Sequence, residues 1–161
     1  MRKNKGFSLV ELIIVIAIMA ILVGIMVPVM MHFIEKSNVS SDYQLADTIR
    51  SAVAYSIVDA KVKEDPNSQD GLAALEASEV DIADLAGLCN IPAGESSELI
   101  DSLTEYLGMD PAVVVNEIKS YHGSNVACMV STVNGVVRVR LADTDSTGRK
   151  KPDDYPDIEV Q

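Results

Sequence analysis

The chain has 161 residues and a formal net charge of −11, from 24 acidic and 13 basic side chains. This acidic balance excludes non-specific nucleic-acid binding by one copy of the chain, because the phosphate backbone needs a footprint of Lys and Arg. The length allows one small domain beside an N-terminal segment. No P-loop, H-E-x-x-H, Cys-x-x-Cys or G-x-S-x-G motif is present, so no enzyme class is indicated.

A basic leader and a long apolar run open the chain. Arg2, Lys3 and Lys5 stand in the first six residues, where there is no acid, and Leu12–Met31 is an uncharged run of 20 residues. At ~1.5 Å rise per residue this run forms a helix of about 30 Å, which matches the hydrocarbon core of a bilayer. The basic residues predict that the N-terminus stays in the cytoplasm and the rest of the chain crosses the membrane.

Three features set this run apart from an ordinary secretory signal. No small-residue cleavage site follows it. Glu11 stands at its edge, and a carboxylate within a membrane helix costs roughly 2.5–3.5 kcal/mol, so an acid there is a functional candidate that needs a cation. Pro28 removes a backbone donor, which kinks or loosens a helix that otherwise continues.

The N-terminal segment has a fixed order of parts. A short basic leader comes first, followed by Gly6, Phe7, three further residues, Glu11 and about twenty apolar residues. This pattern resembles the class III signal of type IV pilins and the related pseudopilins, over about residues 1–60. The resemblance implies that a prepilin peptidase cuts the Gly6–Phe7 bond on the cytoplasmic face and methylates the new amine of Phe7. It also implies that Glu11 meets that amine on a neighbouring subunit and that the helix can unwind locally at Pro28 in a filament.

The helical pattern continues beyond the apolar run. Apolar residues recur at steps of three and four from Val39 to Ala60, and charged residues such as Asp42 lie off this stripe. The pattern predicts one helix from Phe7 to about Lys63, apolar all round in its first half and amphipathic in its second. The stripe alone also fits a membrane anchor with a coiled-coil stalk.

The rest of the chain predicts short helices. Residues 64–71 contain Pro, Asn and Gly and end the long helix. The expected helices are Leu72–Ala77, Ile82–Leu88, about Ser97 to Leu107 with Ser96 as its cap, and a helix opened by Asp110-Pro111 and ended by Gly123.

A β-hairpin is the clearest strand signal. Asn134-Gly135 separates two β-branched runs, Val126–Val133 and Val136–Leu141, and this dipeptide suits a type I′ turn. Ile158–Val160 is a candidate third strand. A small antiparallel sheet packed on the apolar stripe predicts an α+β fold, which is also the architecture that the resemblance implies.

Two further pairs of residues are candidate sites. Cys89 and Cys128 are the only cysteines, and an even count in an exported domain suggests one disulfide, with two buried free thiols as the alternative. Asp143 and Asp145 form a weak Ca²⁺-loop pattern, with a solvated loop as the alternative. No other cofactor is expected.

The sequence therefore predicts four parts: a leader (1–6), a transmembrane and filament-core helix (7–31), its amphipathic continuation (32–63) and a globular extracellular domain (64–161). The predicted function is a non-enzymatic pilin that polymerises with identical or related subunits. Its expected partners are the membrane, a prepilin peptidase and a pilus assembly platform, and it moves from the cytoplasmic membrane to a cell-surface filament. Two alternatives stay open: a pseudopilin of a type II secretion or DNA-uptake system, and a monomeric membrane-anchored binding domain.

Overall fold

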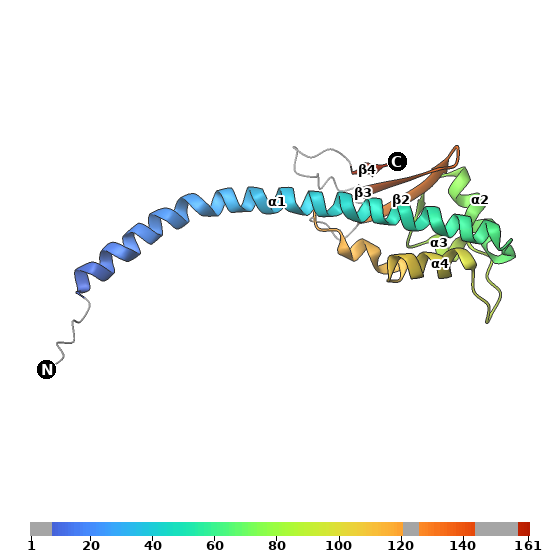
Figure 1. Cartoon of the computed structure of the whole chain (residues 1–161), viewed down its shortest axis with the longest axis horizontal. Helices are drawn as coiled ribbons and strands as arrows, with labels where there is room; N and C mark the ends of the chain where they lie inside the picture. Colours follow the sequence, from blue (N-terminus) through green and yellow to red (C-terminus); the bar gives the residue numbers. More distant parts are fainter. Residues whose placement is uncertain (1–7, 121–125, 144–157) are drawn as a thin grey trace. The chain divides into compact units, whose positions relative to one another are not determined.

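The computed structural model describes residues 8–120, 126–143 and 158–161 (Figure 1). The chain divides into two compact units, Met1–Ser37 and Asn38–Gln161. The described part of the first unit is almost wholly helical, whereas the second contains helices and one four-stranded sheet. The predicted α+β class is confirmed.

The long helix α1 runs from Leu9 to Val62, which confirms the single helix predicted from the sequence. Its end is set by the backbone, because Glu64 adopts a left-handed conformation with φ of 51°. The N–H of Asp65 then donates to the carbonyl of Ala60 at 3.2 Å, which is the closing bond of a Schellman motif. Glutamate thus occupies a position that glycine usually fills.

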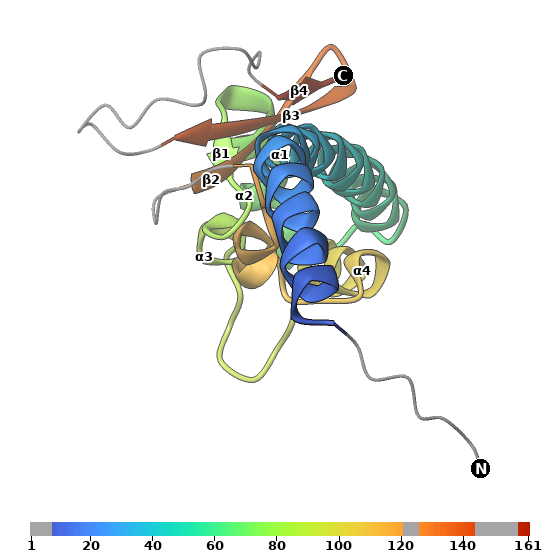
Figure 2. The ribbon, with the colours of Figure 1, turned by 90° about the vertical axis from the view of Figure 1, so that its left-hand side faces the viewer.

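The second half of α1 carries the core of the second unit. Ala46, Ile49, Val53 and Ala60 are fully or almost fully buried, as the predicted stripe requires. They belong to one apolar cluster that also contains the inward-facing residues of the sheet. The strands β2 and β3 lie along one side of this half of α1 and the helix α4 (Glu98–Leu107) along another (Figure 1, Figure 2).

Asp42 contradicts the predicted pattern, because it was expected off the stripe and is fully buried. Its carboxylate accepts hydrogen bonds from the backbone N–H groups of Lys119 at 2.9 Å and Ser120 at 2.7 Å, and also from the Ser120 hydroxyl. These bonds satisfy a buried charge that would otherwise be costly. Asp42 therefore ties a distant segment of the chain to α1.

The sheet is antiparallel in the order β1-β2-β3-β4. The predicted hairpin is confirmed, with Val133 paired to Val136 and with φ of 54° and 78° at Asn134 and Gly135. The predicted third strand is confirmed as β4, which pairs with β3. The strand β1 was not predicted. The bounds are β1 Val80–Asp81, β2 Val126–Val133, β3 Val136–Asp143 and β4 Glu159–Val160.

Two of the predicted short helices need correction. The helix expected over Ile82–Leu88 is only α3 (Leu85–Leu88), because Ile82 donates its N–H to the Cys128 carbonyl and extends the pairing beside β1. The helix expected to reach Gly123 is a 3₁₀ helix, η2 (Pro111–Glu117), in a segment rich in β-branched valine. The helix α2 (Gln69–Ala77) begins three residues before the predicted Leu72–Ala77, and the 3₁₀ helix η1 (Pro66–Ser68) was not predicted. The helix α4 lies within the predicted range.

The start of α4 is capped by residues from η1 and the residue before it. Ser97 rather than Ser96 is the N-cap residue, but its side chain makes no capping bond. The Asp65 carboxylate accepts from the Glu98 N–H at 2.8 Å, and the Ser68 hydroxyl accepts from the Leu99 N–H at 3.0 Å. Partial burial raises the pKa of Asp65, but hydrogen bonds from Ser68 and from backbone N–H groups outweigh this effect and lower the pKa below its ordinary value.

Candidate functional site

The first turn of α1 holds Glu11 in a defined position. The Ser8 N–H donates to Oε2 of Glu11 at 2.9 Å, and the Leu12 N–H donates to the Ser8 carbonyl at 3.3 Å. Ser8-Leu9-Val10-Glu11 has the Ser-x-x-Glu spacing of a capping box, and the structure contains one of its two bonds, in which the glutamate satisfies a backbone donor before the helix begins. The carboxylate is therefore directed toward the N-terminal end of the helix, and it remains exposed.

Ser8 was not singled out in the sequence analysis, although Ser8-Leu9-Val10-Glu11 contains the capping-box spacing. Gly6 and Phe7, the residues of the predicted cleavage site, lie outside the described residues. The predicted meeting of Glu11 with the amine of Phe7 on a neighbouring subunit stays a prediction. Among the described residues, none donates a hydrogen bond to Oε1 of Glu11.

The first half of α1 exposes an apolar surface all round. Leu12 is 59% exposed and Met31 is 60% exposed, and the large apolar side chains between them are exposed to a similar degree. Burying one Val, Leu, Ile or Met side chain stabilises by roughly 1.5–3 kcal/mol, so covering the whole run is worth tens of kcal/mol. Within the described residues α1 is the one helix long and apolar enough to cross a membrane.

Pro28 lies inside α1, which continues through it without a break. The proline ring removes the N–H that would bond the carbonyl of Gly24 four residues earlier. A Cβ atom added at Gly24 would have no neighbour within 4 Å, so nothing packed against Gly24 in this chain requires a glycine. Local unwinding at Pro28 in a filament stays a prediction.

The two cysteines are buried free thiols, the alternative to a disulfide that the sequence left open. A Cβ atom added at Gly71 would lie only 2.5 Å from the sulfur of Cys89. A side chain at position 71 would therefore displace that sulfur. Cys128 points into the core from β2, where burial raises its pKa to about 12. Burial also raises the pKa of Cys89. Neither thiol is a ready nucleophile in the folded domain.

The calcium prediction rests on Asp143 and Asp145. Asp143 is the last residue of β3, and Asp145 lies outside the described residues. In the described part of the chain no three His, Cys, Asp or Glu side chains gather as a metal site. The Ca²⁺ site therefore stays a prediction.

Comparisons with known proteins point to the same N-terminal segment. Residues 1–27 match the model of the prokaryotic N-terminal methylation motif. The chain is 41% identical over 54 residues to a fimbrial protein of Moraxella nonliquefaciens, which is 34% of this chain and 35% of that protein. It is 38% identical over 58 residues to the type IV major fimbrial protein FimA of Dichelobacter nodosus, 36% of each chain.

A third relative, the fimbrial protein EcpC of Eikenella corrodens, is 39% identical over 71 residues, 44% of this chain and 46% of that protein. The matches to these three relatives thus cover between about a third and a half of their lengths. No solved structure matches the chain. The family resemblance inferred from Gly6, Phe7 and Glu11 is confirmed for the N-terminal segment.

Proposed function

We propose that this chain, which belongs with the type IV pilins in its N-terminal segment, is a structural subunit that polymerises into a type IV pilus-like filament. It is made as a precursor, cut after Gly6 and methylated on Phe7. The first half of α1 anchors it in the cytoplasmic membrane and then forms the filament core. The second unit forms the filament surface.

The observation that carries this proposal is the uncovered apolar surface of the first half of α1. No described residue of the chain buries this surface. A partner that buried it would stabilise the complex by tens of kcal/mol, at roughly 1.5–3 kcal/mol per side chain. Lipid covers it before assembly, and equivalent helices of other subunits cover it afterwards. A helix that only anchored a monomer would need neither the methylation motif nor an acid at its start.

Glu11 supports the same function through its geometry. One carboxylate oxygen caps its own helix through the Ser8 N–H. The other oxygen then accepts from the amine of Phe7 on a neighbouring subunit, so both bonds form together. A carboxylate that enters an apolar bundle must be paired, because an unpaired charge there is expensive.

The proposed partners follow from the steps by which the chain is processed and assembled. A prepilin peptidase removes residues 1–6 at the cytoplasmic face, and an assembly platform moves the mature chain from the membrane into the filament. The relatives are named as fimbrial proteins, and we propose no catalytic function.

Intact-mass and N-terminal mass spectrometry of the protein from its own cells tests the processing. The proposal predicts a chain that begins at methylated Phe7. A chain that still begins at Met1 would contradict it and would favour a membrane-anchored monomer.

A further inference from the structure

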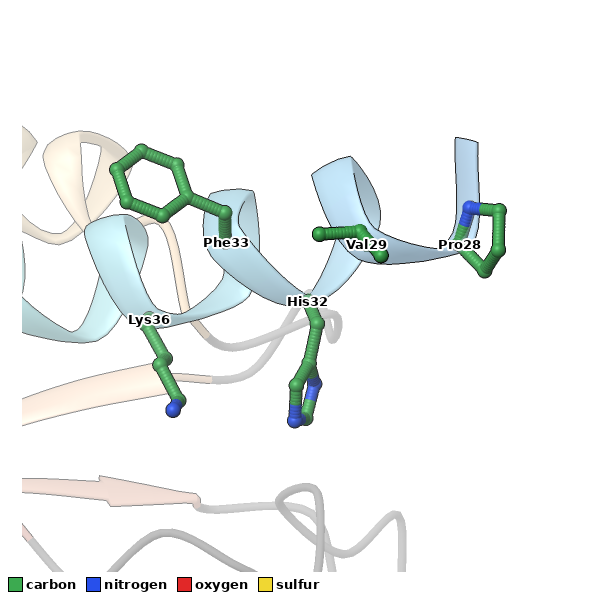
Figure 3. Close-up of a pocket in the computed structure, with 5 residues that line it drawn as sticks. All are labelled: Pro28, Val29, His32, Phe33 and Lys36. Carbon is green, nitrogen blue, oxygen red and sulfur yellow. The ribbon is translucent and has the colours of Figure 1, made fainter. Parts of the chain in front are cut away.

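A shallow hollow lies on α1 where its apolar run ends. Pro28, Val29, His32, Phe33 and Lys36 line it, and its volume is about 430 Å³ (Figure 3). All five residues belong to the first unit. The lining is mainly apolar, with the imidazole and the ammonium group as its nitrogen-bearing side chains.

His32 and Lys36 are one helical turn apart and project from the same side of α1 (Figure 3). Nδ1 of His32 lies 3.5 Å from the carboxylate of Glu35, which does not line the hollow. Lys36 makes no ion pair with any of the residues that the structure describes. Among these described residues the ammonium group has no ionic partner, and it stands beside an apolar surface.

The depth of Lys36 matches that of lipid headgroups. It follows Met31, the last residue of the uncharged run, by five residues, or ~7.5 Å at the helical rise. The headgroup layer on each side of a bilayer is about 5–8 Å thick, from the difference between its total and hydrocarbon thickness. Once the run spans the bilayer, Lys36 lies among the phosphates and Pro28 among the upper acyl carbons.

We propose that this hollow binds an anionic phospholipid, with its phosphate on Lys36 and His32 and its upper acyl chain on Pro28 and Val29. The inference rests on the membrane-spanning placement in the proposed function. The first half of α1 from a second copy is a poorer occupant, because Glu35 is the only acid between Leu12 and Ser41 and already lies beside its own His32. Each anionic lipid instead brings a phosphate at the required depth.

The test uses the full chain reconstituted in bilayer nanodiscs of phosphatidylcholine and phosphatidylglycerol, released into the gas phase for native mass spectrometry. We expect phosphatidylglycerol to be retained in preference to phosphatidylcholine. Lys36→Gln should lower its retention about fivefold, the effect of one lysine charge beside an anionic membrane surface. Lys61→Gln is the matched control, because it removes the same charge from α1 where Lys61 pairs with Glu76, and it should change nothing.

Equal retention of the two lipids, or unchanged retention in Lys36→Gln, would overturn the inference while leaving the proposed function intact. Displacement of the lipid by millimolar inorganic phosphate would assign the site to a free anion and also overturn it. Lost filament assembly in Lys36→Gln, with lipid retention unchanged, would assign the hollow to a second copy. A chain that fails to insert into the bilayer would contradict both the inference and the membrane anchoring in the proposed function.

Discussion

The two halves of α1 share one secondary structure but differ in what covers them. Ile16 in the first half is 57% exposed, whereas Ile49 in the second half is completely buried. The second half finds its apolar partners in its own chain, in the sheet and the short helices. The first half finds none among the described residues, and in the proposed function its apolar partners are lipid and the helices of other subunits. The buried half of α1 therefore contributes to folding, and the exposed half is the part that the proposed function assigns to assembly.

Truncating one isoleucine in each half of α1 tests whether the two halves differ in their contribution to folding. Ile49→Ala should lower the free energy of unfolding of the second unit by about 2–5 kcal/mol, because it opens a cavity in the core. Ile16→Ala should change it by less than about 0.5 kcal/mol, since that side chain is largely exposed among the described residues. Urea unfolding of the full chain in detergent, followed by near-UV circular dichroism, measures both. Equal losses would show that the first half also contributes to the fold.

A second test concerns the buried acid of the second half. Asp42→Ala leaves the N–H groups of Lys119 and Ser120 without their acceptor, and each unsatisfied donor costs about 1–3 kcal/mol. Asp47→Ala is the control, because Asp47 is exposed and pairs only with Arg50 on the surface, an interaction worth about 0–1 kcal/mol. The same urea series compares them. A loss for Asp42→Ala no larger than the control's would refute the anchoring role.

The third test uses pH. Because the folded-state pKa of Asp65 is lowered, its stabilising effect is fully present above the unfolded value near 4 and is lost as the pH falls through the folded value. The wild-type second unit should therefore lose stability below about pH 4. Asp65→Asn should cost about 1 kcal/mol at pH 7, as the loss of a cap does, and should flatten this acid dependence. Parallel slopes of unfolding free energy against pH in both proteins would rule out this role of Asp65.

The smallest expected effect lies at the end of α1. Glu64 has a φ of 51°, a left-handed conformation that is unfavourable for a residue with a side chain but not for glycine. Glu64→Gly should therefore raise the free energy of unfolding, by up to about 1 kcal/mol. Ala73→Gly, at an exposed position in the middle of α2, should lower it by a similar amount. A destabilised Glu64→Gly variant would mean that the glutamate side chain makes a contribution of its own.

Local patterns in the sequence predicted the parts of the fold that depend on neighbouring residues. The 3.6-residue period predicted α1, and Asn134-Gly135 predicted the hairpin, because both signals are complete within a few residues. The N-terminal motif was recognisable for the same reason, since the leader, Gly6, Phe7 and Glu11 lie within one short stretch, and the roles of these residues stay predictions. The capping bond from Ser8 was readable from the same stretch.

The missed features depend on partners far along the chain. Asp42 is buried because its donors come 77 and 78 residues later, and no local pattern shows that. The start of α4 is capped by Asp65, 33 residues before Glu98, so the local sequence pattern wrongly predicted Ser96 as the cap. The strand β1 exists only because β2 pairs with it. Each of these features depends on a tertiary contact, which no short stretch of sequence shows.

The most direct measurement of the central claim is the number of filaments on cells that carry Glu11 variants, counted by electron microscopy. Glu11→Gln keeps an oxygen that can accept from the Ser8 N–H but removes the charge, whereas Glu11→Ala removes both, and Glu35→Ala is the control acid on the same helix. If charge pairing with the neighbouring amine drives assembly, both Glu11 variants should be processed to Phe7 and yet form few filaments, while Glu35→Ala forms normal numbers. Normal filament numbers in Glu11→Gln would contradict the account and leave Glu11 as a helix cap alone.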